Sequence, residues 1–90
     1  MKLYDLGQKG GGLNRMMEAR HAALEGEQAL VITRRGGREV GLLIDRDVLR
    51  LSRTMRRLGL GVSRLSIHRG GLYVVHLESG DVARARSEIK

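Results

Sequence analysis

The chain has 90 residues, enough for one domain, and its 17 Lys and Arg against 10 Asp and Glu give a formal net charge of +7. The absence of Cys excludes disulfides, thiolate catalysis and Cys-ligated zinc. No apolar run approaches the ~20 residues of a membrane span, and the N-terminus lacks the apolar stretch of a signal peptide. We therefore expect residues 1–90 to form a single soluble, cytoplasmic domain without a membrane partner.

The excess positive charge is local and consists mainly of arginine. Residues 45–69 hold seven basic and two acidic side chains, and 14 of the 17 basic residues in the chain are Arg. Arginine makes planar, bidentate contacts to phosphate and carboxylate groups. A concentrated field of Arg therefore favours a polyanion or an acidic protein as partner. A solvated helix face is the simpler alternative.

The N-terminal segment predicts a strand, a glycine-rich break and a helix. Lys2 to Leu6 alternates weakly between apolar and polar residues, as a short strand does. Residues 7–12 contain four glycines but lack the spacing of a P-loop or of a dinucleotide-binding turn. Leu13 to Leu24 has the apolar spacing of a helix, which Gly26 ends.

The break and the helix together form one candidate anion site. Lys9, Asn14 and Arg15 would gather at the N-terminus of the helix, where the helix dipole favours a phosphate. We take these three side chains as candidate DNA-binding residues. A flexible hinge without a ligand is the alternative reading of the glycines.

A tight hairpin is predicted in the middle of the chain. Two apolar, β-branched runs, Ala29 to Thr33 and Glu39 to Ile44, flank Gly36 and Gly37. Glycines at both loop positions supply the positive φ that a two-residue hairpin turn needs.

In that register, two pairs of charged residues face each other beside the turn. Arg34 faces Glu39, which is favourable, whereas Arg35 faces Arg38, and like charges directly opposite cost stability. A hairpin tip that tolerates this cost is a candidate anion contact. Arg34, Arg35 and Arg38 are therefore predicted DNA-binding residues.

The next helix is expected to begin at a cap, Asp45, and to run to about Leu58. It has an apolar stripe of Val48, Leu51, Met55 and Leu58, and a basic stripe of Arg46, Arg50, Arg53 and Arg57. We expect Val48 and Leu51 in the core. The candidate surface for a protein partner is the basic stripe together with Met55 and Leu58.

The C-terminal third predicts a second hairpin about Gly70 and Gly71, and a last helix capped near Asp81. The predicted fold class is α+β, a small mixed sheet of β-hairpins packed against helices in the order β-α-β-β-α-β-β-α. Residues 32–34 and 67–69 both lead to a Gly-Gly pair. An internal ββα duplication would explain this similarity, and chance is the alternative.

Nothing in the sequence points to catalysis, a cofactor or a metal. The side chains that titrate near neutral pH are His21, His68 and His76. A two-residue turn in the second hairpin would put His68 and His76 on opposite faces, where they cannot share a metal ion. The serines lack a nucleophile-elbow motif. We expect a protein that is not an enzyme and needs no cofactor.

One stretch of the chain carries a recognisable order of motifs. Leu30 to Ile44 reads as a strand ending Ile-Thr-Arg, a short turn with Gly and a second apolar strand, and an acid-containing helix start follows at residues 45–47. This order resembles the Phd/YefM family of bacterial antitoxins, over residues 1–58 when the preceding strand and helix are included. The resemblance implies a part that dimerises and binds operator DNA, and a C-terminal segment that wraps a toxin.

The chain departs from that family in two places. The family usually has a Ser and a DNA-gripping Arg just before its first helix, where this chain has glycines at 10–12. The family's tail is usually helical and acidic, whereas residues 62–90 are predicted to be folded, without net acidic charge.

Two functions from different classes fit these patterns. The leading expectation is a dimeric, DNA-binding, antitoxin-like transcriptional repressor of a toxin–antitoxin system, whose arginines contact the phosphates of duplex DNA. The alternative is a non-enzymatic interaction module, such as an accessory or inhibitor protein of a mobile element, that docks on an acidic protein through the Arg-rich helix. An RNA-binding module that recognises shape is a third reading.

Overall fold

The computed structural model describes residues 1–7, 12–61 and 64–89. In these residues the helices and strands follow the predicted order, which confirms the α+β class. The elements are β1 (Lys2–Asp5), α1 (Gly12–Leu24), β2 (Ala29–Arg35), β3 (Arg38–Asp45), α2 (Val48–Leu58), β4 (Leu65–His68), the 3-10 turn η2 (Arg69–Gly71), β5 (Leu72–Leu77) and α3 (Ser79–Ser87). None of the helices described is both long and apolar enough to cross a bilayer.

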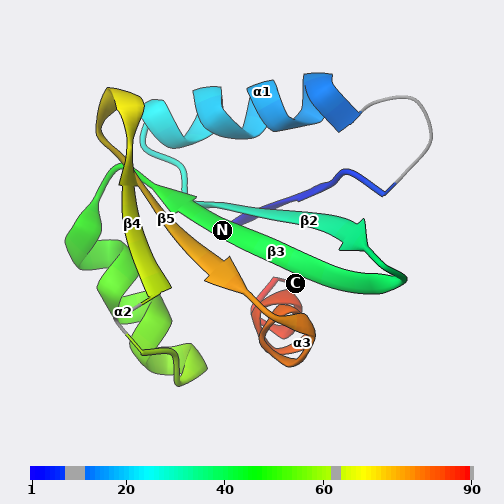
Figure 1. Ribbon diagram of the computed structural model, residues 1–90. Helices are drawn as coiled ribbons and strands as arrows, with labels where there is room; N and C mark the ends of the chain where they lie inside the picture. The colour runs from blue at the N-terminus through cyan, green and yellow to red at the C-terminus, as the bar shows by residue number, and fades with distance from the viewer. Residues whose placement is uncertain (8–11, 62–63, 90) are drawn as a thin grey trace.

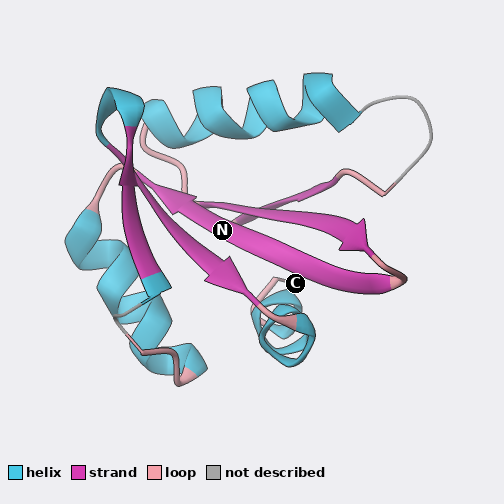
Figure 2. Ribbon diagram, viewed as in Figure 1, coloured by secondary structure: helices cyan, strands magenta, loops and turns pink. Residues whose placement is uncertain are grey.

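A five-stranded sheet with the strand order β1-β2-β3-β5-β4 forms the middle layer of the fold. β1 and β2 are parallel, with α1 as the crossover between them, and the other neighbouring strands are antiparallel. α1 covers one face of the sheet, and α2 and α3 cover the other (Figure 1 and Figure 2). Both faces of this sheet are therefore buried.

Each face of the sheet has its own small core. The buried residues on the α1 side are Tyr4, Ala19, Ala23, Ala29, Val31, Ile44, Leu72 and Val74. Those on the α2 and α3 side are Leu30, Ile32, Leu43, Leu51, Met55, Leu58, Val75, Leu77, Val82 and Ala85. The prediction that Met55 and Leu58 contact a partner is wrong, because both are buried with Leu51 against the sheet. Val48, predicted in the core with Leu51, is only half-buried.

The first hairpin has the predicted register. Arg34 pairs with Glu39, and Arg35 pairs with Arg38. Gly36 and Gly37 form the loop with φ of 60° and 78°, a region of backbone conformation that favours glycine. The strands continue up to this loop, so the arginines lie on paired strand ends.

The cap of α2 is Asp47 and not, as predicted, Asp45. The Asp47 carboxylate accepts hydrogen bonds from the backbone amides of Leu49 and Arg50, at 3.0 and 3.1 Å. Asp45 is instead the last residue of β3 and is fully buried. The carboxylate predicted to cap α2 is therefore buried in the interior of the fold.

The second hairpin differs from its prediction by one residue of register. Three residues, η2, form its turn, and His68 pairs with Leu72. Because successive side chains of a strand alternate between faces, His68 lies on the α1 side together with His76. The predicted placement of these histidines on opposite faces is wrong. The two ββα units are adjacent through β3 and β5, but their turns differ in length.

Candidate nucleic-acid interface

Three arginines end the β2–β3 hairpin, which projects past the helices on both sides of the sheet (Figure 1). Arg34, Arg35 and Arg38 are exposed. Within the described part of the chain, none of them forms a hydrogen bond or an ion pair, and no described atom lies near the outer side of Gly36 or Gly37. Arg34 lies beside Asp5, since a Cβ added at Gly7 would meet Asp5 Oδ1 at 3.1 Å and Arg34 Nε at 3.5 Å. The guanidinium groups at the tip without a neighbouring carboxylate in the described chain are therefore those of Arg35 and Arg38.

The positive charge of Arg35 and Arg38 is not neutralised by an ion pair within the described fold. Arg35 and Arg38 are direct cross-strand partners, an arrangement of like charges that costs stability. The neighbouring acid, Glu39, is engaged by Arg86 of α3, which donates to its two carboxylate oxygens at 3.3 and 3.0 Å. An external anion would remove the repulsion that the fold leaves in place.

The α1 side of the tip is extended by the start of α1, which lies at the same end of the molecule (Figure 1). Arg35 and Arg38 lie on the α1 face of the hairpin, and Arg34 lies on the opposite face. Asn14 is exposed and Arg15 is half-buried. The fold thus brings four predicted DNA-binding residues to one end on one side. Of the other two, Arg34 lies on the opposite face and Lys9 lies outside the described residues.

The predicted basic stripe of α2 is mostly engaged within the chain. Arg46 donates to the carbonyl of Leu24 at 3.0 Å, and Arg57 donates to Glu88 at 3.1 Å. Arg50 donates to the Gly26 carbonyl at 2.7 Å and to Asp45. Of the predicted partner-binding arginines, Arg53 is the one that is exposed and makes no such contact with the described residues. Sequence reasoning missed these contacts because their partners lie on other elements.

A buried polar cluster holds the base of α2 against the sheet. Asp45 accepts hydrogen bonds from Arg50 at 2.6 and 2.8 Å and from Gln28 at 3.0 Å. Gln28 also donates to Thr54 Oγ1 at 3.0 Å. Burial of the Asp45 carboxylate opposes its ionisation, but hydrogen bonds from Arg50, the Asp47 amide and Gln28 outweigh burial and lower the pKa of Asp45 below 3.8. Every member has a partner, so the cluster is structural.

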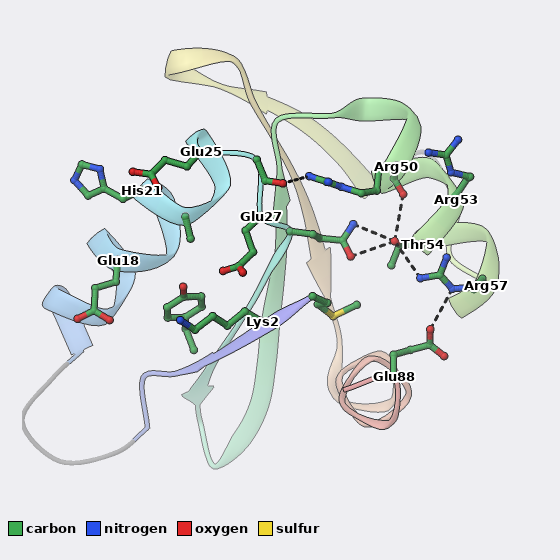
Figure 3. Close-up of a pocket in the computed structure, with 15 residues that line it drawn as sticks. Lys2, Glu18, His21, Glu25, Glu27, Arg50, Arg53, Thr54, Arg57 and Glu88 are labelled. Atoms are coloured by element: carbon green, nitrogen blue, oxygen red, sulfur yellow. Dashed lines mark hydrogen bonds and ion pairs between the residues drawn. The ribbon is translucent and has the colours of Figure 1, made fainter. Parts of the chain in front are cut away.

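A groove of about 1000 Å³ lies between α1 and α2, beside the start of β1 and β2 (Figure 3). The α1 wall is formed by Glu18, His21 and Ala22 of α1 and by Glu25, the residue that follows the helix. The α2 wall is formed by Arg50, Arg53, Thr54 and Arg57 of α2. Each set follows the i, i+3, i+4, i+7 spacing of one helix face. The sequence did not predict this groove, because its walls come from helices that meet only through the fold.

The histidines form no metal centre with the described residues. No group of three or more His, Asp or Glu among them is placed to hold a metal ion. His68 contacts the hydroxyl of Ser66 at 3.2 Å. With His76 it lines a pocket of about 60 Å³ under α1.

Comparison with known proteins adds no functional information. No protein-family model matches the chain, and no curated protein and no solved structure matches it. The function is therefore argued from the geometry and charge of the two surfaces described above, the arginine tip and the groove.

Proposed function

We propose that this protein is a dimeric, antitoxin-like transcriptional repressor that binds duplex DNA through arginine–phosphate contacts. The observation that supports the proposal is the hairpin tip, where Arg34, Arg35 and Arg38 are exposed and where Arg35 and Arg38 face each other with no ion pair to a described acid. A phosphate between Arg35 and Arg38 would relieve their mutual repulsion and accept charge-assisted hydrogen bonds. Asn14 and Arg15 extend the same contact surface.

The shape of the tip also suits DNA. The major groove of B-DNA admits a two-stranded β-ribbon, and arginine recognises guanine there by two parallel hydrogen bonds. Residues 33–40 of the β2–β3 hairpin pair with no other described strand and form such a ribbon, closed by two glycines that add no side-chain bulk. Contacts from Arg34 and Arg15 to phosphates would fix its register, while Arg35 or Arg38 reads a base.

The antitoxin part of the proposal rests on the resemblance of residues 1–58 alone. The described residues of the C-terminal third form β4, β5 and α3 on the common sheet and not an extended tail. A toxin partner would therefore be bound by a folded surface.

The alternative, a module that docks on an acidic protein through α2, has less support. Met55 and Leu58 are core residues, and Arg50 and Arg57 are already paired with Asp45 and Glu88. A docking surface on α2 would have to use Arg53 and its exposed neighbours.

The experiment is a titration of a fluorescent duplex with the wild-type protein, the double variant R35A/R38A and the control R69A. Arg69 is an exposed arginine in the turn of the other hairpin, so its removal matches the chemistry at a different place. We expect at least tenfold weaker binding for R35A/R38A and little change for R69A. Equal affinities of the two variants, or no binding by the wild type at about 50 mM salt, would refute the proposal.

A further inference from the structure

The groove between α1 and α2 has walls of opposite charge. The carboxylates of Glu18 and Glu25 stand on the α1 wall, and the guanidinium groups of Arg50, Arg53 and Arg57 stand on the α2 wall (Figure 3). In each case the first and last charged residues are seven positions apart, which is about 10 Å along a helix. The two charged walls therefore have the same length.

The walls run in opposite directions. Glu25 and Arg50 lie at the same end of the groove, where the chain passes from α1 to β2, and Glu18 and Arg57 lie toward the other end (Figure 3). On the α2 wall, Arg50 is bonded to Asp45 and Gly26 and Arg57 to Glu88, and Arg53 makes no ion pair with a described residue. On the α1 wall, neither Glu18 nor Glu25 makes an ion pair with another described residue.

The groove is locally balanced in charge on a strongly basic chain. Its lining has four basic side chains, Lys2, Arg50, Arg53 and Arg57, and four glutamates, Glu18, Glu25, Glu27 and Glu88. The chain as a whole carries a formal net charge of +7. Two copies repel each other over most of their surface, but they can approach at a surface where each supplies both signs.

The floor of the groove does not call for a small polar ligand. Gln28 donates a hydrogen bond to Thr54 there, and no buried side-chain nitrogen or oxygen among the described residues lacks a hydrogen-bond partner. A small ligand would find no buried donor or acceptor left unsatisfied among the described residues. The charges available for binding are on the ridges, where a macromolecule makes contact.

We propose that the groove is the interface with a second copy of this chain. A surface that is acidic on one side and basic on the other is self-complementary about a two-fold axis that runs along its middle. Such an axis brings the acidic wall of each copy against the basic wall of the other. Glu25 then faces the end of α2 that carries the unpaired Arg53, and Glu18 faces Arg57, whose ion pair with Glu88 is itself exposed, twice in each dimer.

This interface leaves the arginine tip free. The groove lies beside the start of β2, and Arg34 and Arg35 lie at its far end, about 20 Å away at 3.3 Å per residue. The inference deepens the proposed function, because it supplies the dimer of a two-fold symmetric repressor. It does not depend on DNA binding, since self-association is measured without nucleic acid.

The test is a charge exchange across the interface, followed by sedimentation velocity at several protein concentrations. We expect the wild type to form dimers that weaken as salt is added. The variants E25R and R53E should each dimerise at least tenfold more weakly, because like charges then face each other at two equivalent places. An equimolar mixture of E25R and R53E should recover a dimer. In the mixed dimer the arginine introduced by E25R faces the glutamate introduced by R53E, and the second contact keeps the native Glu25 and Arg53.

The control is R69E, a charge reversal in the exposed β4–β5 turn, which should associate like the wild type. A wild type that stays monomeric, reversal variants that dimerise like the wild type, or a mixture that stays monomeric would each overturn the proposed interface. The DNA titration separates the two proposals. If dimers fail but R35A/R38A still loses DNA binding, only the interface is wrong, and if dimers form without DNA binding, only the proposed function is wrong.

Discussion

The Asp45 carboxylate joins three segments of the chain. It accepts hydrogen bonds from Gln28 before β2, from the backbone amide of Asp47 and from the Arg50 side chain on α2. A buried charge is tolerated when it is paired and fully hydrogen-bonded. Asp45 therefore fixes where α2 begins and also holds Arg50 on one wall of the groove.

Replacing Asp45 by Asn should destabilise the protein by about 1–3 kcal/mol, because the amide keeps the shape but leaves Arg50 without its charged partner. The control is E27Q, an exposed acid nearby, which should change the free energy of unfolding by less than about 0.5 kcal/mol. Urea denaturation of both variants measures the difference. A D45N protein as stable as E27Q would contradict the role assigned to Asp45.

The second buried carboxylate, Asp81, lies in the first turn of α3 and accepts a hydrogen bond from the backbone amide of Glu78, the N-cap residue of that helix. Burial opposes its ionisation, but hydrogen bonds from Arg64, the Glu78 amide and Arg84 outweigh burial and lower the pKa of Asp81 below 3.8. Asp45 and Asp81 thus share the same direction of shift. A carboxyl whose folded pKa is depressed contributes stability above its unfolded pKa, and the contribution is lost as pH falls through the folded pKa.

We therefore expect the free energy of unfolding to change little between about pH 7 and pH 5 and to fall below about pH 4. Thermal or urea unfolding across this range measures the profile. The double variant D45N/D81N should be less stable at neutral pH and should lose less stability on acidification. A wild type that is as stable at pH 3 as at pH 6 would contradict the ion pairs.

At the scale of the elements, α3 packs on β3 through a glycine. A Cβ at Gly41 would lie 3.1 Å from Val82 Cγ2 and 3.2 Å from the Val31 carbonyl oxygen. The backbone oxygen belongs to the sheet and cannot move away easily. A side chain at position 41 would therefore push α3 off the sheet.

The substitution G41A should cost about 1–3 kcal/mol of stability by overpacking. Its matched control is G80A in the first turn of α3, where no described atom lies within 4 Å of an added Cβ. G80A should be neutral or stabilising by up to about 1 kcal/mol, because alanine favours a helix. Equal effects of the two substitutions would show that α3 is not packed as described.

The elements also show how far the sequence predicts this fold. The register of the first hairpin followed from two glycines between apolar runs. The same reasoning failed for the second hairpin, because Gly70 and Gly71 form part of a three-residue turn after Arg69. A Gly-Gly pair predicts a turn, but only pairing with neighbouring strands decides its length and which face each side chain takes.

The candidate sites were predictable to different degrees. The arginine tip is local in sequence, and its residues were identified from their register alone. The engagement of Arg50 by Asp45 and Gly26, and of Arg86 by Glu39, depends on elements brought together by the fold. The groove was missed for the same reason, since neither α1 nor α2 carries both of its walls.

At the scale of the whole molecule, two surfaces of different charge lie near opposite ends of β2. The hairpin tip carries free positive charge at one end of β2, and the groove carries both signs near the other end (Figure 1 and Figure 3). DNA and a second copy of the chain would therefore bind at separate places. This separation allows a dimer to present two arginine tips to one duplex.

The most direct test of this account is the salt dependence of duplex binding for the wild type and for R35A/R38A. Each phosphate contact contributes about 0.9 to the slope of log affinity against log salt concentration. We predict a steep slope for the wild type, reduced in R35A/R38A by roughly one for each protomer if one of the two arginines reads a base, and by roughly two if both contact phosphates. Identical slopes for the two proteins would mean that the hairpin tip does not contact the phosphates, and would contradict the account.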